Sequence, residues 1–200
     1  MNRGILFVIS GPSGTGKGTI CTELLKNDKN NLYLSISSTT REIRNGEVDG
    51  ETYNYTTVEN FKQMIENGEM LEYATYSGNY YGTPKKTVEA LLQQGRNVLL
   101  EIEPQGALQV KKMLPEAVLI FIIPPSMQVL KQRLEDRGRE TEEQIIERLE
   151  AAKWEMEQSP KYNHIFVNDD LLECVREVEE TMRDKVIKRD LVDKLLAEKY

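Results

Sequence analysis

The sequence predicts an α/β fold, in which helices flank a parallel sheet and two further lobes are inserted into that core. Three observations predict it: short apolar runs that end at turn residues, helical patterns between those runs, and two long stretches that break the alternation. An alternation of strand and helix is typical of a parallel sheet covered by helices. The 200 residues suffice for a single domain of this kind with a buried core.

The strands are predicted from their apolar runs. Residues 5–9 form the first run, which stops at Gly11-Pro12 as a strand buried on both faces would. Helices are expected from about Lys17 to Lys26 and from about Pro84 to Gly95. Comparable buried strands are expected at residues 98–102, 118–123 and 165–167.

The first stretch outside the alternation runs from about residue 37 to 81 and is rich in Thr, Tyr, Asn and Gly. Asp49-Gly50 is a hairpin signal within it. One amphipathic helix is expected to end at Gly68, and its apolar face holds Phe61, Met64 and Ile65.

The second stretch, from about residue 126 to 158, is dominated by charge. Thr141 and Gln144 fit a capping box that opens a helix. The apolar stripe of that helix is Ile145, Leu149, Ala152 and Met156. We interpret both stretches as lobes inserted into the parallel core.

Composition excludes several classes of function. With 26 Lys+Arg against 33 Asp+Glu the net charge is −7, which disfavours general nucleic-acid binding. No run of 18 apolar residues and no N-terminal signal pattern occurs, so we expect no membrane span and a cytoplasmic location. Cys21 and Cys174 are expected to be free, buried thiols.

A phosphate-binding loop is predicted after the first strand. The pattern G-x-x-x-x-G-K is matched there, between a buried strand and a helix, where the mechanism requires it. Its glycines let successive backbone N–H groups point at phosphate oxygens, and its lysine reaches the β- and γ-phosphates. The position after the lysine is Gly18, where many such loops have a Mg²⁺-binding hydroxyl, and Thr19 follows it. The matching residues are Gly11, Pro12, Ser13, Gly14, Thr15, Gly16 and Lys17.

Further motifs resemble the guanylate kinase family over roughly residues 4–180. They are Ser37-Ser38-Thr39-Thr40-Arg41-Glu42-Ile43-Arg44, Gly46-Glu47-Val48-Asp49-Gly50, Tyr53, Glu72, Ser77-Gly78-Asn79-Tyr80-Tyr81-Gly82-Thr83 and a later arginine segment. The resemblance implies transfer of the γ-phosphoryl group of ATP to GMP, and also to dGMP. It also implies a P-loop NTPase core with a five-stranded parallel sheet, a mixed α+β GMP-binding lobe and a helical lid.

With these expectations the chain divides as a single guanylate-kinase-like domain, residues 1–200. The core is expected at residues 1–36, 84–125 and 159–200, the GMP-binding lobe at 37–83 and the lid at 126–158. The implied partners are ATP and GMP, with Mg²⁺ as cofactor, no nucleic acid and no membrane. The chain is expected to be a monomer or a homodimer.

The resemblance also assigns the acceptor site. Arg41 and Arg44 are expected to bind the GMP phosphate, because guanidinium groups offer planar, paired donors. Glu72 is expected to accept hydrogen bonds from N1–H and N2–H₂ of guanine. Thr83 has an alternative role as the cap of the following helix. Supporting contacts to GMP are expected from Ser37, Tyr53, Tyr81, Thr83 and Glu103, the last at a position where the family usually has aspartate.

The ATP site and the lid complete the assignment. Asn168 is expected near the adenine, with a helix cap as the alternative. For Arg133 two roles remain open, a further phosphate contact from the lid and a surface ion pair. For Arg139 the surface ion pair is expected. No metal-ligating residue is assigned, because nucleotide phosphates and water can hold Mg²⁺. ATP binding is expected from residues 11–19, which end in Gly18 and Thr19, and catalysis from Lys17, Arg41, Arg44, Arg137 and Arg148.

Two alternatives remain at this point. One is a kinase for another acceptor, such as AMP, UMP or a sugar phosphate, against which Glu72 and the acceptor motifs argue. The other is a catalytically silent guanylate-kinase-like module that binds proteins. Such modules commonly lose the loop and arginine residues that this chain retains.

Overall fold

A computed structural model describes residues 3–76, 78–136, 138 and 141–197, with only the backbone for residues 190–197. Its larger sheet is parallel throughout, with strand order β2-β7-β1-β8-β9. The structure therefore confirms the α/β fold with a five-stranded parallel sheet. The strands are β1 (Leu6–Ser10), β2 (Leu32–Leu34), β7 (Asn97–Glu101), β8 (Val118–Ile123) and β9 (His164–Val167).

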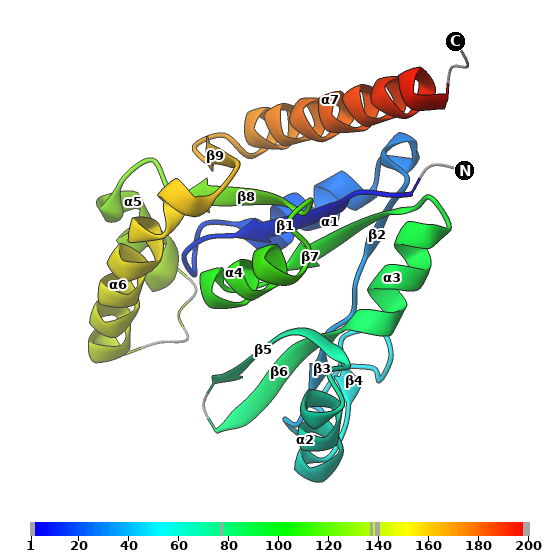
Figure 1. Ribbon diagram of the computed structural model, residues 1–200. Helices are drawn as coiled ribbons and strands as arrows, with labels where there is room; N and C mark the ends of the chain where they lie inside the picture. Colours follow the sequence, from blue (N-terminus) through cyan, green and yellow to red (C-terminus); the bar gives the residue numbers. More distant parts are fainter. Residues whose placement is uncertain (1–2, 77, 137, 139–140, 198–200) are drawn as a thin grey trace.

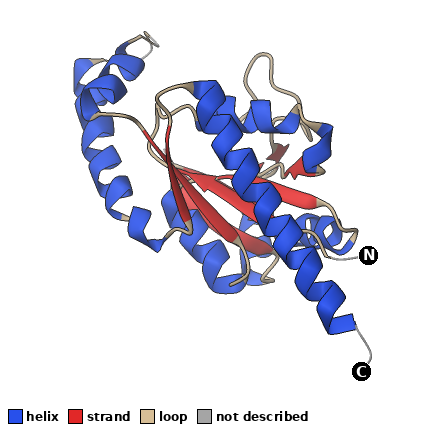
Figure 2. Ribbon diagram, turned by 90° about the horizontal axis from the view of Figure 1, so that it is seen from above, coloured by secondary structure: helices blue, strands red, loops and turns tan. Residues whose placement is uncertain are grey.

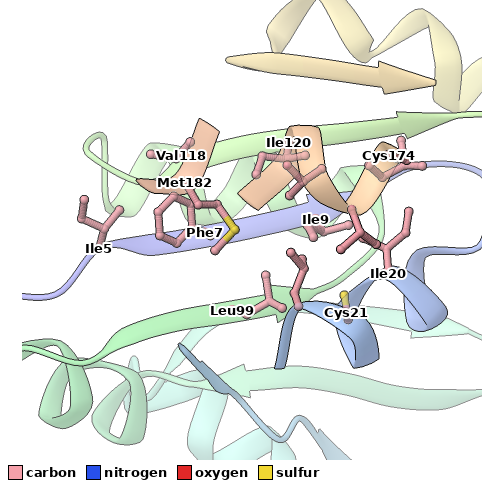
Figure 3. Packing of buried hydrophobic residues seen from close by; sticks show 14 residues of the cluster. Ile5, Phe7, Ile9, Ile20, Cys21, Leu99, Val118, Ile120, Cys174 and Met182 are labelled. Atoms are coloured by element: carbon pink, nitrogen blue, oxygen red, sulfur yellow. The ribbon is translucent and has the colours of Figure 1, made fainter. Parts of the chain in front are cut away.

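Helices cover both faces of this sheet, which gives three layers (Figure 1, Figure 2). Alternate residues of β1 face opposite layers, because side chains alternate along a strand. Phe7 and Ile9 pack with α1 and α7 (Figure 3), while Leu6 and Val8 pack with α3 and α4. The helices are α1 (Lys17–Leu25), α3 (Lys85–Gln93), α4 (Pro104–Met113) and α7 (Leu171–Ala197), with a short 3₁₀ helix, η1 (Asp28–Asn30), after α1.

A smaller mixed sheet lies below the core in Figure 1, with strand order β4-β3-β6-β5. Helix α2 (Val58–Glu66) packs on it through Phe61, whose ring stacks on Tyr80 with 5.4 Å between centroids. Gly68 follows α2 with a φ of 68°, as expected for a helix stop. The strands are β3 (Ser38–Thr39), β4 (Asn54–Tyr55), β5 (Met70–Tyr76) and β6 (Asn79–Pro84).

Helices α5 (Met127–Glu135) and α6 (Glu142–Glu157) form a small hairpin at the left of the core in Figure 1. The capping box of Thr141 and Gln144 is present at the start of α6, as predicted. Ile145 and Ala152 pack with Leu130 and Leu134 of α5 in a separate apolar cluster. A 3₁₀ turn, η2 (Ser159–Lys161), then leads into β9.

Two predictions about local structure are wrong. Asp49-Gly50 makes a turn, with a φ of 78° at Gly50, but no hairpin: strand β4 beyond the turn pairs with β3 in parallel. The run at residues 165–167 forms an edge strand rather than a fully buried one. Ile165 and Val167 are each 47% exposed, because α7 covers only one face of β9. No helix among the described residues is long and apolar enough to cross a membrane.

Candidate functional site

The loop between β1 and α1 has the shape that its glycines predict. Gly11, Gly14 and Gly16 have φ angles of 144°, 93° and 86°, which side chains disfavour. A Cβ on Gly11 would also lie 2.1 Å from the carbonyl oxygen of Ile122, so no larger residue fits there. Because Gly16 is the N-cap residue of α1, the loop ends at the positive end of a helix. Loop and helix together have the geometry that favours an anion.

Lys17 lies across this loop. Its ammonium group donates to the carbonyl oxygens of Gly11 and Pro12. Burial lowers its pKa, while the carboxylates of Glu101, Glu103 and Glu155 act in the opposite direction. The lysine thus lies in the field of three carboxylates, beside amides that favour phosphate.

Gly18 lies against one of these carboxylates. A Cβ at position 18 would be 3.5 Å from Oε1 of Glu101, which is ordinary contact, so a side chain there is not excluded by space. Glu101 keeps partial exposure, yet desolvation raises its pKa against the opposing charge of Lys17. Thr19 is exposed on the first turn of α1. Within the described chain no group of three His, Cys, Asp or Glu side chains is arranged to hold a metal ion.

The helical hairpin contacts the loop through an arginine. Nη1 of Arg148, on α6, donates to the hydroxyl of Ser13 at 2.7 Å. Arg133, on α5, donates to the carbonyl of Asn168 at 2.9 Å, and its buried Nη1 has no partner. Two arginines thus extend from the hairpin toward the loop. Arg137 and Arg139 lie outside the described residues.

Asn168 joins β9 to the phosphate loop. Its buried side-chain amide donates to the carbonyl of Thr15 at 2.7 Å. A Cβ on Gly16 would lie 2.5 Å from that amide nitrogen, so loop and strand end are in close contact. The alternative that Asn168 caps α7 is wrong, because Asp170 accepts the bond from the N–H of Glu173 instead.

Arg41 is fixed by a carboxylate that the sequence analysis did not assign to the site. Its two terminal nitrogens donate to both carboxylate oxygens of Glu47, at 2.9 and 2.8 Å. Glu47 also accepts from the hydroxyl of Tyr55 at 2.8 Å. This pairing lowers the pKa of Glu47 to about 2 and raises that of Arg41.

Aromatic rings surround this arginine. The guanidinium carbon of Arg41 lies 5.5 Å from the ring centre of Tyr53, and the Tyr53 and Tyr81 rings meet edge to face at 5.9 Å. Arg44 is exposed, and its backbone N–H donates to Glu47 at 2.8 Å. Arg41, Tyr53 and Tyr81 are therefore brought together as predicted, with Arg44 at the solvent side. Ser37 directly precedes β3, and its carbonyl accepts from the N–H of Asn54.

Glu72 is a buried carboxylate, only 5% exposed, on strand β5. Its Oε1 accepts a hydrogen bond of 2.7 Å from the hydroxyl of Thr83. Burial raises its pKa, and the bond from Thr83 opposes that shift. Thr83 does not cap the following helix, because the N-cap position of α3 is Pro84, without a side-chain cap.

The start of α4 connects the two halves of the site. Glu103, its N-cap residue, is one of the carboxylates that act on Lys17. One turn later Gly106 faces Glu72, where a Cβ would lie 2.5 Å from Oε2. The carboxylate thus approaches the helix backbone at the only residue type that permits it. The lysine of the phosphate loop and the buried carboxylate are both neighbours of the first turn of α4.

Three site residues were missed by the sequence analysis: Glu47, Glu101 and Glu155. For Glu155 a signal was available, because it lies seven residues after Arg148 and hence on the same face of a helix. Its Oε2 is buried without a partner, and burial raises its pKa to about 7, with Glu103 adding to the shift and Lys17 opposing it.

Comparisons with known proteins agree on one family. The family model described as "Guanylate kinase" matches residues 3–185. A guanylate kinase of Clostridium perfringens strain 13 is 52% identical over 178 residues, covering 89% of this chain and 82% of that protein. A guanylate kinase of Clostridioides difficile strain 630 is 44% identical over 200 residues, covering 100% and 97%.

A solved structure supports the fold as well. The crystal structure of guanylate kinase from Anaplasma phagocytophilum superposes with a TM-score of 0.74 at 32% identity, covering 92% of this chain and 87% of that one.

Proposed function

This chain belongs to the guanylate kinase family and is a nucleoside monophosphate kinase, and we propose that it transfers the γ-phosphoryl group of ATP to GMP or dGMP by direct in-line attack. The attacking oxygen belongs to the acceptor's phosphate and is already anionic near pH 7, so no general base is required. Catalysis then consists of positioning and of neutralising charge on the moving group.

The donor side is served by the phosphate loop and the helical hairpin. Backbone amides of the loop and the start of α1 hold the ATP phosphates, and Lys17 neutralises charge between donor and acceptor. Arg148 already contacts the loop through Ser13 and is placed to join Lys17 there. Arg137 keeps the same proposed role from the family motif, although it lies outside the described residues.

Magnesium fits this site by the chemistry of the available donors. Mg²⁺ prefers oxygen ligands and keeps several waters, and the carboxylates around Lys17 are the nearest oxygens of that kind. Glu101 and Glu103 would hold its water shell, and phosphates would bind it directly. When bound it supplies neutralisation of phosphate charge.

A single observation on the acceptor side carries the proposal. The buried carboxylate of Glu72 lies against Gly106, one turn of α4 after Glu103, which acts on Lys17. Guanine offers two adjacent donors, N1–H and N2–H₂, to such a group. Adenine would leave it facing an acceptor nitrogen, and sites built on hydrogen bonds discriminate by roughly 10⁴ to 10⁵. Arg41, Arg44, Tyr53 and Tyr81 bind the acceptor phosphate, and Ser37 supports the base.

A cytoplasmic location suits this activity. Cys21 and Cys174 are free and buried, as expected for thiols kept in a reducing compartment.

The test is ADP production from Mg·ATP with GMP, dGMP, AMP, UMP and CMP, using the parent protein and Glu72→Gln. We expect turnover with guanine acceptors only, and at least a hundredfold lower kcat/KM for GMP in the variant, roughly 3 kcal/mol, because the amide presents a donor to the base. Glu66→Gln, an exposed carboxylate on α2, is the matched control. Equal turnover of AMP and GMP would contradict the role of Glu72, and no turnover at all would contradict the kinase activity.

A further inference from the structure

A cavity lies at the end of the sheet opposite the phosphate loop. Its volume is about 860 Å³, and its wall includes Gly4 and Ile5, which precede β1, and Asn97, the first residue of β7. In Figure 1 this end of the sheet lies beside the N-terminus and the far half of α7. The loop instead follows Ser10, at the other end of β1. Five residues at about 3.3 Å each separate the two sites by roughly 15 Å or more.

We propose that this cavity binds a phosphorylated small molecule at a site separate from the catalytic one. Four cationic side chains line it, and the described lining contains no carboxylate, although the whole chain has a net charge of −7. Cations concentrated in this way on an acidic protein form a local anion site. The four are Arg3, Lys29, Arg183 and Arg189.

Two of these cations are available to a ligand. Arg3 pairs with Glu116 at 2.9 Å, and Arg189 has interactions of its own. Lys29 and Arg183 make no ion pair within the described part of the chain. They come from η1 and α7, so an anion between them would be held from two sides. Arginine is suited to phosphate by its paired donors.

The wall between the cations is fixed by amide side chains. Asn97 is buried; it accepts from the N–H of Ile5 and donates to the carbonyl of Asn30, both at 3.0 Å. Asn31 is the one described non-glycine residue with positive φ, 44°, and its amide donates to the carbonyl of Gly95.

One carboxylate of α7 is hydrogen-bonded to two residues of the cavity wall. Glu179 on α7 accepts from the side-chain amides of Asn27 and Asn30, at 3.0 and 2.8 Å. Both amides bind Oε1 of Glu179, which holds this carboxylate on the amides of the wall.

An organic body is accommodated beside the phosphate. Ile5, Met182 and Val186 add apolar surface to the lining, and the volume falls in the range of small-molecule sites. The ligand class is therefore a phosphate joined to a small organic group, rather than a bare anion.

Amide-resolved NMR of the full chain tests this, because it reports the two sites separately. The probes are inorganic tripolyphosphate, for phosphate alone, and ADP, for phosphate with an organic body. We expect saturable shifts of the Gly95 and Asn97 amides at millimolar ADP, distinct from the shifts of Gly14 and Gly16. Tripolyphosphate should bind more weakly than ADP at the cavity.

Arg183→Ala should weaken ADP binding at the cavity about tenfold, as expected for loss of one charge-assisted contact. Lys188→Ala, also on α7 but paired with Asp184 outside the cavity, is the matched control. Phosphoryl transfer to GMP should be unchanged in both variants. Cavity amides that do not shift, or shifts that Arg183→Ala leaves intact, would overturn the proposal. Equal binding of tripolyphosphate would overturn the part assigned to the organic body.

Discussion

Glu47 shows how one residue can position another without touching a substrate. Its carboxylate holds both terminal nitrogens of Arg41, accepts from Tyr55 and accepts the backbone N–H of Arg44. An arginine oriented in this way has lost its rotational freedom before the acceptor phosphate arrives. Preorganisation of this kind favours binding because less entropy is lost on complex formation.

Replacing Glu47 should therefore weaken binding of the acceptor nucleotide and leave binding of the donor nucleotide unchanged. We predict that Glu47→Gln raises the KM for GMP about tenfold, in the range seen for loss of supporting contacts, and leaves the KM for ATP unchanged. Steady-state kinetics with each nucleotide varied in turn checks this, with Glu42→Gln, an exposed neighbour, as the control. A parallel rise in both KM values would mean that the variant is damaged more generally.

Gly106 is the second residue whose identity the site determines. A methyl group there would lie 2.5 Å from Oε2 of Glu72, so the carboxylate or the helix must move. We predict that Gly106→Ala lowers kcat/KM for GMP by roughly tenfold to a hundredfold, because misplaced hydrogen-bonding groups lose orientation. Gln105→Ala, exposed on the same turn, should be neutral. Unchanged kinetics for Gly106→Ala would show that Glu72 can move at no cost.

Among single residues, those that belong to a motif could be predicted from the sequence. Residues whose role depends on a partner brought near by the fold could not. The loop residues were predicted from a pattern with a physical mechanism, and Arg41 and Glu72 from family motifs. Glu47 stood inside a family motif and Glu101 inside the predicted strand at residues 98–102, but nothing in the sequence indicates which side chain a carboxylate faces. The role of Thr83 as a cap failed because its hydroxyl was already bound to Glu72.

At the scale of elements, β9 matters mainly through its last contact. Asn168 follows the strand and binds the carbonyl of Thr15, while Arg133 of α5 binds the carbonyl of Asn168. Loop, edge strand and helical hairpin are thus linked through one residue. This linkage explains why a strand with two exposed side chains is still part of the donor site.

Breaking this linkage should weaken ATP binding. We predict that Asn168→Ala raises the KM for ATP several-fold and lowers the free energy of unfolding by about 1–2 kcal/mol, because the buried carbonyl of Thr15 loses its donor. Titration with ATP and denaturant unfolding measure the two effects. Asp169→Ala, exposed and adjacent, is the control. A change in the KM for GMP alone would contradict this prediction, because Asn168 is hydrogen-bonded to the phosphate loop.

Elements were predictable in proportion to their apolar signal. The runs at β1, β7 and β8 are long and buried on both faces, and all three were predicted. Strand β2 has only three residues, all half-buried, and β3 and β4 have two residues each. Strands this short show no recognisable hydrophobic periodicity. The Asp49-Gly50 signal produced a turn, but strand pairing beyond a turn depends on contacts with the rest of the lobe.

For the whole molecule, the main electrostatic feature is the group of carboxylates around Lys17. The chain is acidic overall, and three of its carboxylates act on the one lysine of the phosphate loop. Glu155 is the one of the three with a buried oxygen that lacks a partner. A charge held in that way should influence the stability of the entire fold, since its ionisation differs between the folded and unfolded chain.

The sign of that influence follows from the direction of the shift. Burial raises the pKa of Glu155 from 4.5 to about 7, so between these values the folded chain binds more protons than the unfolded one. The unfolding free energy must then fall as pH rises through this window, and the loss is complete above pH 7. Converted in full, the pKa shift corresponds to about 3 kcal/mol of unfolding free energy, and partial exposure of Glu155 reduces the expected value to about 1–2 kcal/mol.

We predict that Glu155→Gln matches the parent below pH 4.5 and exceeds its stability by that amount at pH 8. Thermal and denaturant unfolding across this range measure it, with Glu157→Gln, exposed on the same helix, as the control. A difference independent of pH would mean that packing, rather than ionisation, sets the effect of Glu155.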